Sequence, residues 1–251
     1  MRDTEDKRDL PSVTESLVIS EVFGPTVQGE GPHAGQRAAF VRLGGCNLEC
    51  WWCDTAYTWD AKRFNLREEL RRERLAEIEA KVLDTGAARV IITGGEPLLQ
   101  QRGDYGLVRL VYWLAWRHGL KVDVETNGTI EPDGELVNVV DLFVVSPKLS
   151  NAGMPAARTQ RAKPLELFAA LAARGQAVFK FVCAQPADLG EVEALIERYG
   201  IARHTVWLMP EGMDAATLIE RGRPLADAAI EAGFNFTTRL HVLAWGNERG
   251  R

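Results

Sequence analysis

One pattern recurs five times along the chain: a segment with helical periodicity ends at a glycine, and a run rich in Val, Ile, Phe and Leu follows. Glycine closes helices well because it adopts positive φ without a Cβ clash. Largely apolar runs are typical of strands that are covered on both faces. In chain order, the five runs follow Gly86, Gly119, Gly175, Gly200 and Gly233. Helix-then-strand units in this number predict an α/β fold with a parallel sheet and helical crossovers.

Further strands and helices extend this pattern. Three more strands are expected at Leu17–Phe23, Ala38–Leu43 and Val139–Val145. A helix is expected between Leu66 and Leu83, where Asn65 can cap it and Glu68 stands three residues further on. Other helices are expected near 106–117, 164–173, 186–199 and 213–231. Gly222 and Pro224 are expected to break the last of these, since neither suits a helix interior.

Four of the expected strands end in segments that combine glycine or proline with polar side chains. These segments are Thr93–Pro97, Glu125–Gly128, Ser146–Lys148 and Met209–Gly212. Parallel α/β barrels build their active sites on this carboxyl face, from the loops that follow the strands. One such segment marks only a turn, but four together favour an active site. We therefore expect a single α/β domain, a partial or modified TIM-type (β/α) barrel with parallel strands, although periodicity alone does not separate it from a doubly wound sheet.

Length and composition set the domain boundaries and the class of protein. The 251 residues allow one large domain or two small ones, and the repeated unit favours one. We expect a disordered, highly charged tail over 1–16, the barrel over 17–246, and a C-terminal tail over 247–251. The net charge of −5 argues against a chain that coats nucleic acid. No apolar run approaches the ~20 residues of a membrane span, and residues 1–9 lack the apolar region of a signal peptide, so we expect a cytoplasmic protein.

Three of the four cysteines, Cys46, Cys50 and Cys53, lie within eight residues, and Cys183 lies far from them. A disulfide framework of a secreted protein would spread its cysteines more evenly. The spacing would also place the three on one face of a buried helix, but the paired glycines Gly44–Gly45 before them oppose a helix there. The cysteines therefore point to metal or redox chemistry in a loop at residues 44–60, here called the cysteine loop.

Three kinds of site compete for these thiols. A structural zinc site needs four ligands, and the nearest histidine, His33, is isolated. A redox Cys-x-x-Cys pair would suit Cys50 and Cys53 but leaves Cys46 unexplained. A three-thiolate iron–sulfur site fits best, because thiolates are soft ligands that suit such clusters. A typical cluster has four cysteine ligands, so three would leave one iron open to an exogenous ligand.

The spacing Cys-x-x-x-Cys-x-x-Cys, followed later by a strand that ends in Gly94–Pro97 (Gly-Gly-Glu-Pro), resembles the radical S-adenosylmethionine (SAM) enzymes. The resemblance implies a 4Fe–4S cluster on Cys46, Cys50 and Cys53, whose open iron binds the amino and carboxylate groups of SAM. It implies that the backbone of Gly94–Pro97 lies against the SAM amino group. It also implies reductive cleavage of SAM to a 5′-deoxyadenosyl radical, while the protein holds SAM and substrate close and dry.

Further motifs narrow the resemblance to the 7-carboxy-7-deazaguanine synthase family, over most of the chain. The matching segments are Gln28–Gly31, Ala39–Leu43, Gly45–Leu48, Cys53–Thr55, Thr93–Pro97, Glu125–Gly128 and Val145–Lys148. Members are lyases of queuosine-type 7-deazapurine biosynthesis, which rearrange 6-carboxy-5,6,7,8-tetrahydropterin to 7-carboxy-7-deazaguanine with loss of ammonia. The resemblance implies a homodimer that uses Mg2+ and takes electrons from a donor such as flavodoxin or ferredoxin.

The resemblance also assigns ligands to residues of this chain. The implied substrate contacts are Val27, Gln28, Gly29, Glu30, Arg42, Thr93 and Glu125. The implied SAM contacts are Trp52, Cys53, Asp54, Gly95, Ser146, Pro147 and Lys148. Thr55 is the implied Mg2+ ligand, and no residue is implied as a catalytic acid or base. Glutamine and glutamate supply the donors and acceptors that a pterin edge needs, and arginine suits its carboxylate. Glu125 could equally be a structural carboxylate, and Trp52 could pack over the cysteine loop.

Two other functions stay open on the sequence alone: another radical SAM reaction, such as glycyl-radical activation, and a non-enzymatic iron–sulfur or zinc-binding module. Gln28–Glu30 and Cys53–Thr55 argue against the first, and Gly94–Pro97 at a strand end argues against the second. His241 matches a family histidine, but a lone histidine is more often structural. Cys183 is expected to be a buried, inert thiol.

Overall fold

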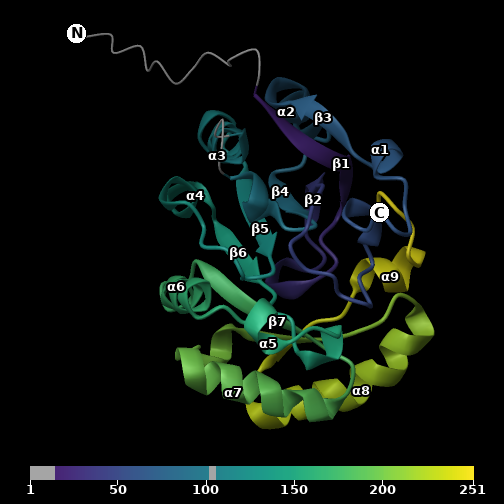
Figure 1. Ribbon diagram of the computed structural model, residues 1–251, viewed down its shortest axis with the longest axis vertical. Coiled ribbons are helices and arrows are strands. Elements are labelled where there is room, and N and C mark those ends of the chain that lie inside the picture. The colour runs from purple at the N-terminus through teal and green to yellow at the C-terminus, as the bar shows by residue number, and fades with distance from the viewer. Residues whose placement is uncertain (1–14, 102–105) are drawn as a thin grey trace.

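A single nine-stranded sheet organises the chain (Figure 1). The structure is a computed structural model that describes residues 15–101 and 106–251. Its strands are β1 Ser16–Val27, β2 Arg37–Leu43, β3 Arg71–Arg74, β4 Arg89–Gly94, β5 Lys121–Thr126, β6 Leu142–Val145, β7 Ala177–Cys183, β8 Val206–Pro210 and β9 Asn235–Phe236. Its α-helices are α1 Leu66–Glu69, α2 Leu75–Asp84, α3 Gly106–Tyr112, α4 Gly134–Val139, α5 Ala156–Thr159, α6 Ala162–Ala172, α7 Leu189–Tyr199, α8 Ala215–Ala232 and α9 Leu240–Trp245. A π-helical turn, Trp113–Arg117, continues α3, and short 3-10 turns join other elements.

The strand order identifies the kind of α/β fold. Across the sheet the order is β3-β1-β2-β4-β5-β6-β7-β8-β9, and every pair from β2 to β9 is parallel, whereas β1 pairs antiparallel with both β2 and β3. A doubly wound sheet reverses its order at a switch point, but here the parallel strands β2 to β9 follow one another in chain order, with only the antiparallel edge strand β3 out of sequence. Right-handed crossovers then place the helices on one face. Figure 1 shows α2, α3, α4, α6, α7 and α8 as an outer layer around the curved sheet, which confirms the expected partial barrel.

The two faces of each strand have different tasks, because successive side chains point to opposite sides of a sheet. In β7, Phe179, Phe181 and Cys183 belong to the apolar core beneath the helices. Lys180 and Val182, between them, line the interior of the barrel. Burial raises the pKa of Cys183, so its thiol stays protonated and inert as expected. The interior face is therefore free to carry polar groups while the outer face holds the fold together.

The segment between Leu66 and Leu83 differs from the single helix that its periodicity predicts. Asn65 caps α1 as expected, but the helix ends after one turn because Leu70 is extended. The next four residues form β3, which pairs with β1 and buries Glu73 between Arg71 and Lys81. Strand pairing thus overrides a helical pattern here, and α2 begins only afterwards.

Three other expectations also need correction. Helix α8 runs unbroken through Gly222 and Pro224, since its apolar residues, among them Leu218 and Leu225, continue on one buried face on both sides of the proline. Residue 139 ends α4, which the sequence did not predict, and β6 starts only at Leu142. The strand expected after Gly233 is reduced to β9, because α9 begins at Leu240.

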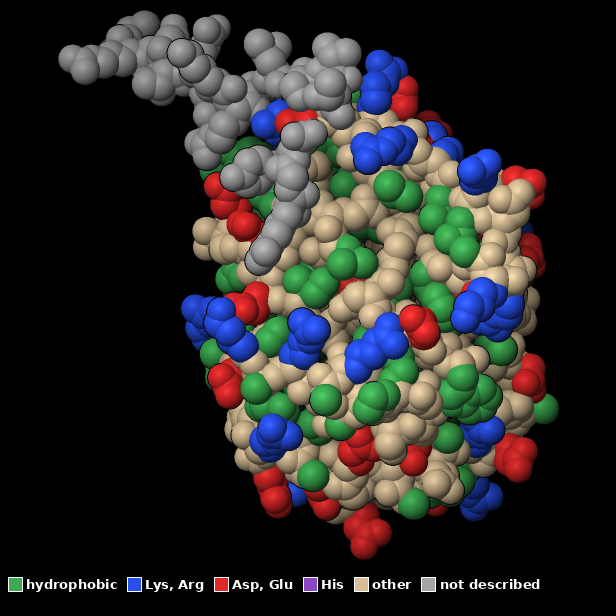
Figure 2. Space-filling model, viewed as in Figure 1, with side chains coloured by type: hydrophobic (Ala, Val, Ile, Leu, Met, Phe, Trp, Pro, Cys, Tyr) green, Lys and Arg blue, Asp and Glu red, His purple; other side chains and the backbone are tan. Residues whose placement is uncertain are grey.

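The ends of the chain and its surface complete the description. Most of the predicted tail, 1–14, lies outside the described residues, but Ser16 begins β1 and Glu15 is buried with its carboxylate 2.7 Å from Arg109. No helix among the described residues is long and apolar enough to cross a membrane. Figure 2 shows basic and acidic side chains interspersed over the viewed face rather than gathered by sign.

Candidate functional site

A cavity of about 480 Å³ opens at the carboxyl ends of the parallel strands, where the loop sequences predict a site. It brings together all but one of the residues assigned to ligands. Those lining it are Val27, Gln28, Gly29, Glu30, Arg42, Cys46, Cys50, Trp52, Cys53, Asp54, Thr55, Thr93, Gly95, Glu125, Ser146 and Lys148. Pro147 is not among the lining residues. Segments from β1 to α9 thus converge on one chamber, as a barrel mouth requires.

The loop after β4 holds the cysteine loop by direct backbone contact. The Gly95 and Glu96 amides donate to the carbonyls of Leu43 and Gly45, at 3.1 and 2.8 Å. A Cβ on Gly95 would lie 2.0 Å from the Gly45 carbonyl oxygen and 3.0 Å from the Cys46 Cβ. Only glycine permits this approach, so Gly95 is required where the first cysteine begins its loop.

Glu96 fixes this loop to β5 rather than facing the cavity. It is fully buried, and its carboxylate accepts hydrogen bonds from the amides of Leu98 (2.9 Å) and Asn127 (2.7 Å) and from the Thr126 hydroxyl. Burial raises its pKa, although these donors oppose the rise. Asn127 in turn donates to the side chain of Asn47 at 2.9 Å. The ends of β4 and β5 therefore clamp the cysteine loop from two sides.

The three clustered cysteines form no disulfide, and all three line the cavity. Burial raises the pKa of the Cys46 thiol to about 12 and raises that of Cys50, and the thiols reinforce this by repelling one another as thiolates. The Cys53 sulfur accepts a hydrogen bond from the Trp59 indole at 3.3 Å. Such buried thiols need a strongly positive centre to become thiolates.

These cysteines fit an iron–sulfur cluster better than one metal ion. In the described part of the chain, no three Cys, His, Asp or Glu side chains are arranged to hold a metal ion. In a cluster each thiolate binds its own iron, so the sulfurs need not converge on one point. Cys183 sits in the helix-covered core and not at the cavity, which leaves three thiolates for the site.

Aromatic and cationic groups line the cavity beside the cysteines. The Lys148 ammonium lies 5.6 Å from the centre of the Trp52 ring and donates to the Ser146 hydroxyl at 2.8 Å. The indoles of Trp51 and Trp52 both donate to the Asn151 carbonyl, but Trp51 is 67% exposed and does not line the cavity. Trp52 thus offers a ring to a ligand, whereas Trp51 packs on the outside.

A second set of polar groups lies deeper in the barrel. Glu125 accepts hydrogen bonds from Gln28 Nε2 (3.1 Å) and from the Thr93 hydroxyl (2.8 Å), so the loop after β1 meets strands β4 and β5 at one carboxylate. Arg42 lies over the Phe23 ring, 5.6 Å from its centre. Arg42 lines the cavity, and its buried Nε has no hydrogen-bond partner among the described residues.

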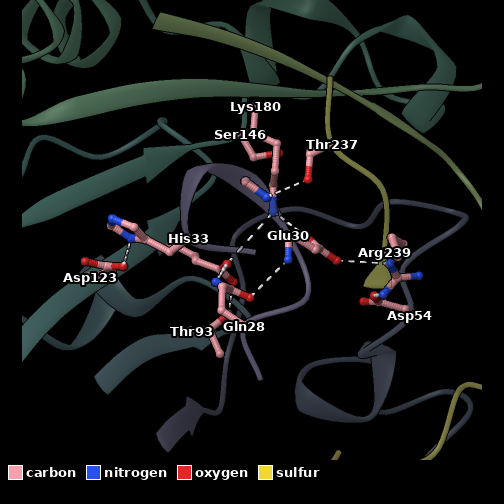
Figure 3. Close-up of polar contacts among 12 residues, drawn as sticks. Gln28, Glu30, His33, Asp54, Thr93, Asp123, Ser146, Lys180, Thr237 and Arg239 are labelled. Atoms are coloured by element: carbon pink, nitrogen blue, oxygen red, sulfur yellow. Dashed lines mark hydrogen bonds and ion pairs between the residues drawn. The ribbon is translucent and has the colours of Figure 1, made fainter. Parts of the chain in front are cut away.

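Two cations that the sequence reasoning missed complete this set. Glu30 forms ion pairs with Lys180 of β7 and, at 3.0 Å, with Arg239, which also pairs with Asp54 (Figure 3). Burial opposes ionisation of Glu30, but the two cations outweigh it and hold its pKa well below the ordinary value. Arg239 likewise outweighs burial at Asp54 and lowers its pKa. A lysine in the middle of the apolar run Ala177–Cys183 was the available sequence signal.

His241 and the segment 247–251 also reach the cavity. Burial lowers the pKa of His241, so its ring is neutral near pH 7. Arg249 pairs with Glu21 and Glu69, each at 2.9 Å, and its guanidinium lies 3.7 Å from the centre of the Tyr57 ring. The segment predicted to be a separate tail therefore belongs to the cavity wall. By contrast, His33 pairs with Asp123 and lies outside the cavity lining.

The chain is similar to known proteins in sequence and in fold. The profile of the Radical SAM superfamily matches residues 40–142. The chain is 43% identical over 241 residues to the 7-carboxy-7-deazaguanine synthase of Pyrobaculum aerophilum, which covers 96% of this chain and 100% of that protein. It is 35% identical to the enzyme of the same name from Halobacterium salinarum, over 92% of this chain and 91% of that protein. In fold it is similar to the crystal structure of QueE from Escherichia coli, with a TM-score of 0.65 and 24% identity over 90% of this chain and 95% of that chain.

Proposed function

The chain belongs to the 7-carboxy-7-deazaguanine synthase family of radical SAM enzymes, and from this premise we propose that it converts 6-carboxy-5,6,7,8-tetrahydropterin to 7-carboxy-7-deazaguanine with loss of ammonia. The observation that supports this most directly is that one cavity unites the cysteines, the loop after β4 and the Gln28, Glu30 and Glu125 side chains. A reaction between SAM and a second small molecule needs both kinds of group in one chamber.

The cofactors of this family are a 4Fe–4S cluster and SAM. Cys46, Cys50 and Cys53 would hold the cluster, which when bound supplies the electron for reductive cleavage of SAM. We propose that Trp52, Cys53, Asp54, Gly95, Ser146 and Lys148 contact SAM from the cavity wall, and that Pro147 contacts it from between the last two. The Trp52 face and the Lys148 ammonium suit an adenine ring and a carboxylate, respectively.

The deeper groups suit the pterin. The oxygens of Glu30 and Glu125 accept hydrogen bonds and so match the N–H donors of a 2-amino-4-oxopyrimidine edge, and Gln28 offers a donor and an acceptor. The guanidinium of Arg42, which lines the cavity, suits the pterin carboxylate, with Val27, Gly29 and Thr93 completing the wall. These contacts would orient the ring and exclude water around the reacting carbon.

The Mg2+ site, the oligomeric state, the cellular location and the electron donor are proposed from the family resemblance. Thr55 lines the cavity, with its hydroxyl 3.7 Å from the Cys53 sulfur, and is the proposed Mg2+ ligand. Mg2+ often takes one or two protein oxygens and completes its octahedron with substrate and water. We further propose a cytoplasmic homodimer that receives electrons from flavodoxin or ferredoxin.

An activity assay tests the proposal. The protein is reconstituted anaerobically with iron and sulfide and then incubated with SAM, reductant, Mg2+ and the carboxytetrahydropterin. We expect formation of 7-carboxy-7-deazaguanine, detected by mass spectrometry, with SAM regenerated. Cys50→Ala should abolish both the cluster absorbance at about 400 nm and formation of the product. Cys183→Ala is the matched control and should retain both, since Cys183 lies outside the cavity. Cleavage of SAM without any deazapurine would refute the substrate and leave the radical SAM assignment intact.

A further inference from the structure

Lys180 is the one lysine buried among the described residues, and it is only 5% exposed. It stands in β7 between Phe179 and Phe181, in a strand that is otherwise apolar. Burying an ammonium costs free energy unless nearby groups pair with it. For packing alone, an apolar side chain would serve at this position in β7 without that cost. Its partners therefore indicate its task.

The ammonium lies between two cavity carboxylates that come from distant parts of the chain. It forms an ion pair with Glu30 Oε2, in the loop after β1, and its Nζ lies 3.9 Å from Glu125 Oε1, on β5. Strand β6 separates β5 from β7 in the sheet, so the lysine reaches across the barrel interior rather than to a neighbouring strand. Figure 3 shows Glu30 between Lys180 and Arg239.

The remaining oxygens of the two carboxylates are also held. Glu30 Oε1 accepts from Arg239 at 3.0 Å. Glu125 Oε1 accepts from Gln28, and Oε2 accepts from the Thr93 hydroxyl. Each oxygen thus has one protein donor and keeps a lone pair, because a carboxylate oxygen can accept two hydrogen bonds. Of the described residues, Lys180 alone forms an ion pair with both carboxylates.

We propose that Lys180 is a positioning residue, which holds Glu30 and Glu125 side by side as two hydrogen-bond acceptors and so selects a substrate edge with adjacent N–H donors. This inference rests on the proposed function and adds a residue that sets its specificity. A 2-amino-4-oxopyrimidine edge carries such donors, whereas a 2-oxo edge presents an oxygen that ionised carboxylates repel.

The surrounding charges determine how the pair responds to pH. Arg239, from the segment before α9, and His241, from α9, face Glu30; Asp54 and Arg42 lie beyond Arg239 at the cavity wall. At Lys180, burial favours the neutral amine, but Glu30 and Glu125 outweigh it and raise its pKa, so it stays charged. Without Lys180, burial would raise the pKa of Glu30, with Arg239 left to oppose this. A protonated Glu30 carboxyl then donates a hydrogen bond and loses its preference for N–H groups.

Equilibrium binding separates this role from a merely structural one. The reconstituted protein with SAM but without reductant is titrated with 6-carboxy-5,6,7,8-tetrahydropterin by calorimetry, for wild type, Lys180→Met and Lys180→Arg. Lys163→Met, an exposed lysine on α6, is the matched control. Because the ratio of the variant Kd to the wild-type Kd cancels the titration of the ligand, we expect this ratio to rise as the pH falls for Lys180→Met, by up to about tenfold per pH unit once the pH is below the raised pKa of Glu30. Lys180→Arg should restore most of the affinity, and the control should match wild type.

A second readout uses the 2-oxo analogue of the same pterin. Wild type should bind it at least about tenfold more weakly than the 2-amino compound, and Lys180→Met should lose most of this preference at low pH. If Lys180→Met does not fold, Lys180→Gln, which is polar but uncharged, should show the same two changes. An equal loss of affinity at every pH, or an unchanged preference, would overturn the positioning role. Failure of wild type to bind the carboxypterin would instead refute the proposed substrate, and this inference with it.

Discussion

Replacing Gly95 by alanine tests whether the contact between the β4 loop and the cysteine loop holds the cysteines in place. The new methyl group would lie 2.0 Å from the Gly45 carbonyl oxygen, where ordinary contact begins near 3.4 Å. The cysteine loop would therefore have to move by more than an ångström. Such a shift would break the hydrogen bond from the Glu96 amide to the same carbonyl, now 2.8 Å long, and displace Cys46.

The magnitude follows from these contacts. A buried backbone group left without its partner costs about 1–3 kcal/mol, and residual strain adds to this. We expect Gly95→Ala to lower the free energy of unfolding of the cluster-free protein by about 2–4 kcal/mol. For a domain of this size, each kcal/mol lowers the melting temperature by about 2–4 °C, so the expected decrease is about 5–15 °C.

Calorimetry of the cluster-free protein and iron content after reconstitution give the two measurements. Gly134→Ala is the matched control, because a Cβ at Gly134, in the first turn of α4, meets no atom within 4 Å. It should leave both values unchanged or raise the melting temperature slightly, since alanine suits a helix better than glycine. If Gly95→Ala had the melting temperature of wild type and the same iron content after reconstitution, the close contact at Gly95 would not be what positions Cys46.

Three further predictions concern the cavity wall. In the cluster-free protein, iodoacetamide should alkylate Cys46 slowly at neutral pH and about tenfold faster with each unit of rising pH, because burial raises its pKa to about 12; the rate of a free thiol would contradict this. Lys148→Met should weaken SAM binding about tenfold in equilibrium dialysis, because the Lys148 ammonium lies beside the Trp52 ring. The control Lys121→Met, at the exposed start of β5, should bind SAM as tightly as wild type does. Arg249→Gln should cost less than about 1 kcal/mol of stability, because its guanidinium is about half exposed, but it should raise the KM for the pterin several-fold. An unchanged KM would show that Arg249 takes no part in pterin binding.

The sequence predicted the parts of this site that are encoded locally. The cysteines and the Gly-Gly-Glu-Pro segment each lie within a few residues, and a parallel α/β pattern is enough to place strand-end loops on one face. The missing parts depend on distant partners. Lys180 meets Glu30 across 150 positions, and Arg239 meets it across 209. A single sequence contains no signal for such pairs beyond an unexpected charge in an apolar strand.

The errors in the fold have a similar origin. Residues Leu66–Leu83 carry a helical pattern, and only the pairing of Arg71–Arg74 with β1 makes part of that segment extended. In α8, by contrast, the local effect of Pro224 is overridden by a continuous buried face against the sheet. In both places tertiary packing exceeds the local preference of the backbone, which differs by about 1 kcal/mol per residue for most residue types and about 3 for proline.

The ion pairs of Arg239 have a consequence for how the protein is made. They join residues 185 and 209 positions apart, so Asp54 and Glu30 emerge from the ribosome long before the guanidinium that neutralises them. Contacts of such long sequence separation form late, because the chain must first close the largest loops. The cysteine loop is thus synthesised early, and the segment around Arg239 that encloses the cavity is added last. Iron that binds during translation would find the cavity still open on one side. Iron that binds after the chain is released would have to enter through the opening of the completed cavity.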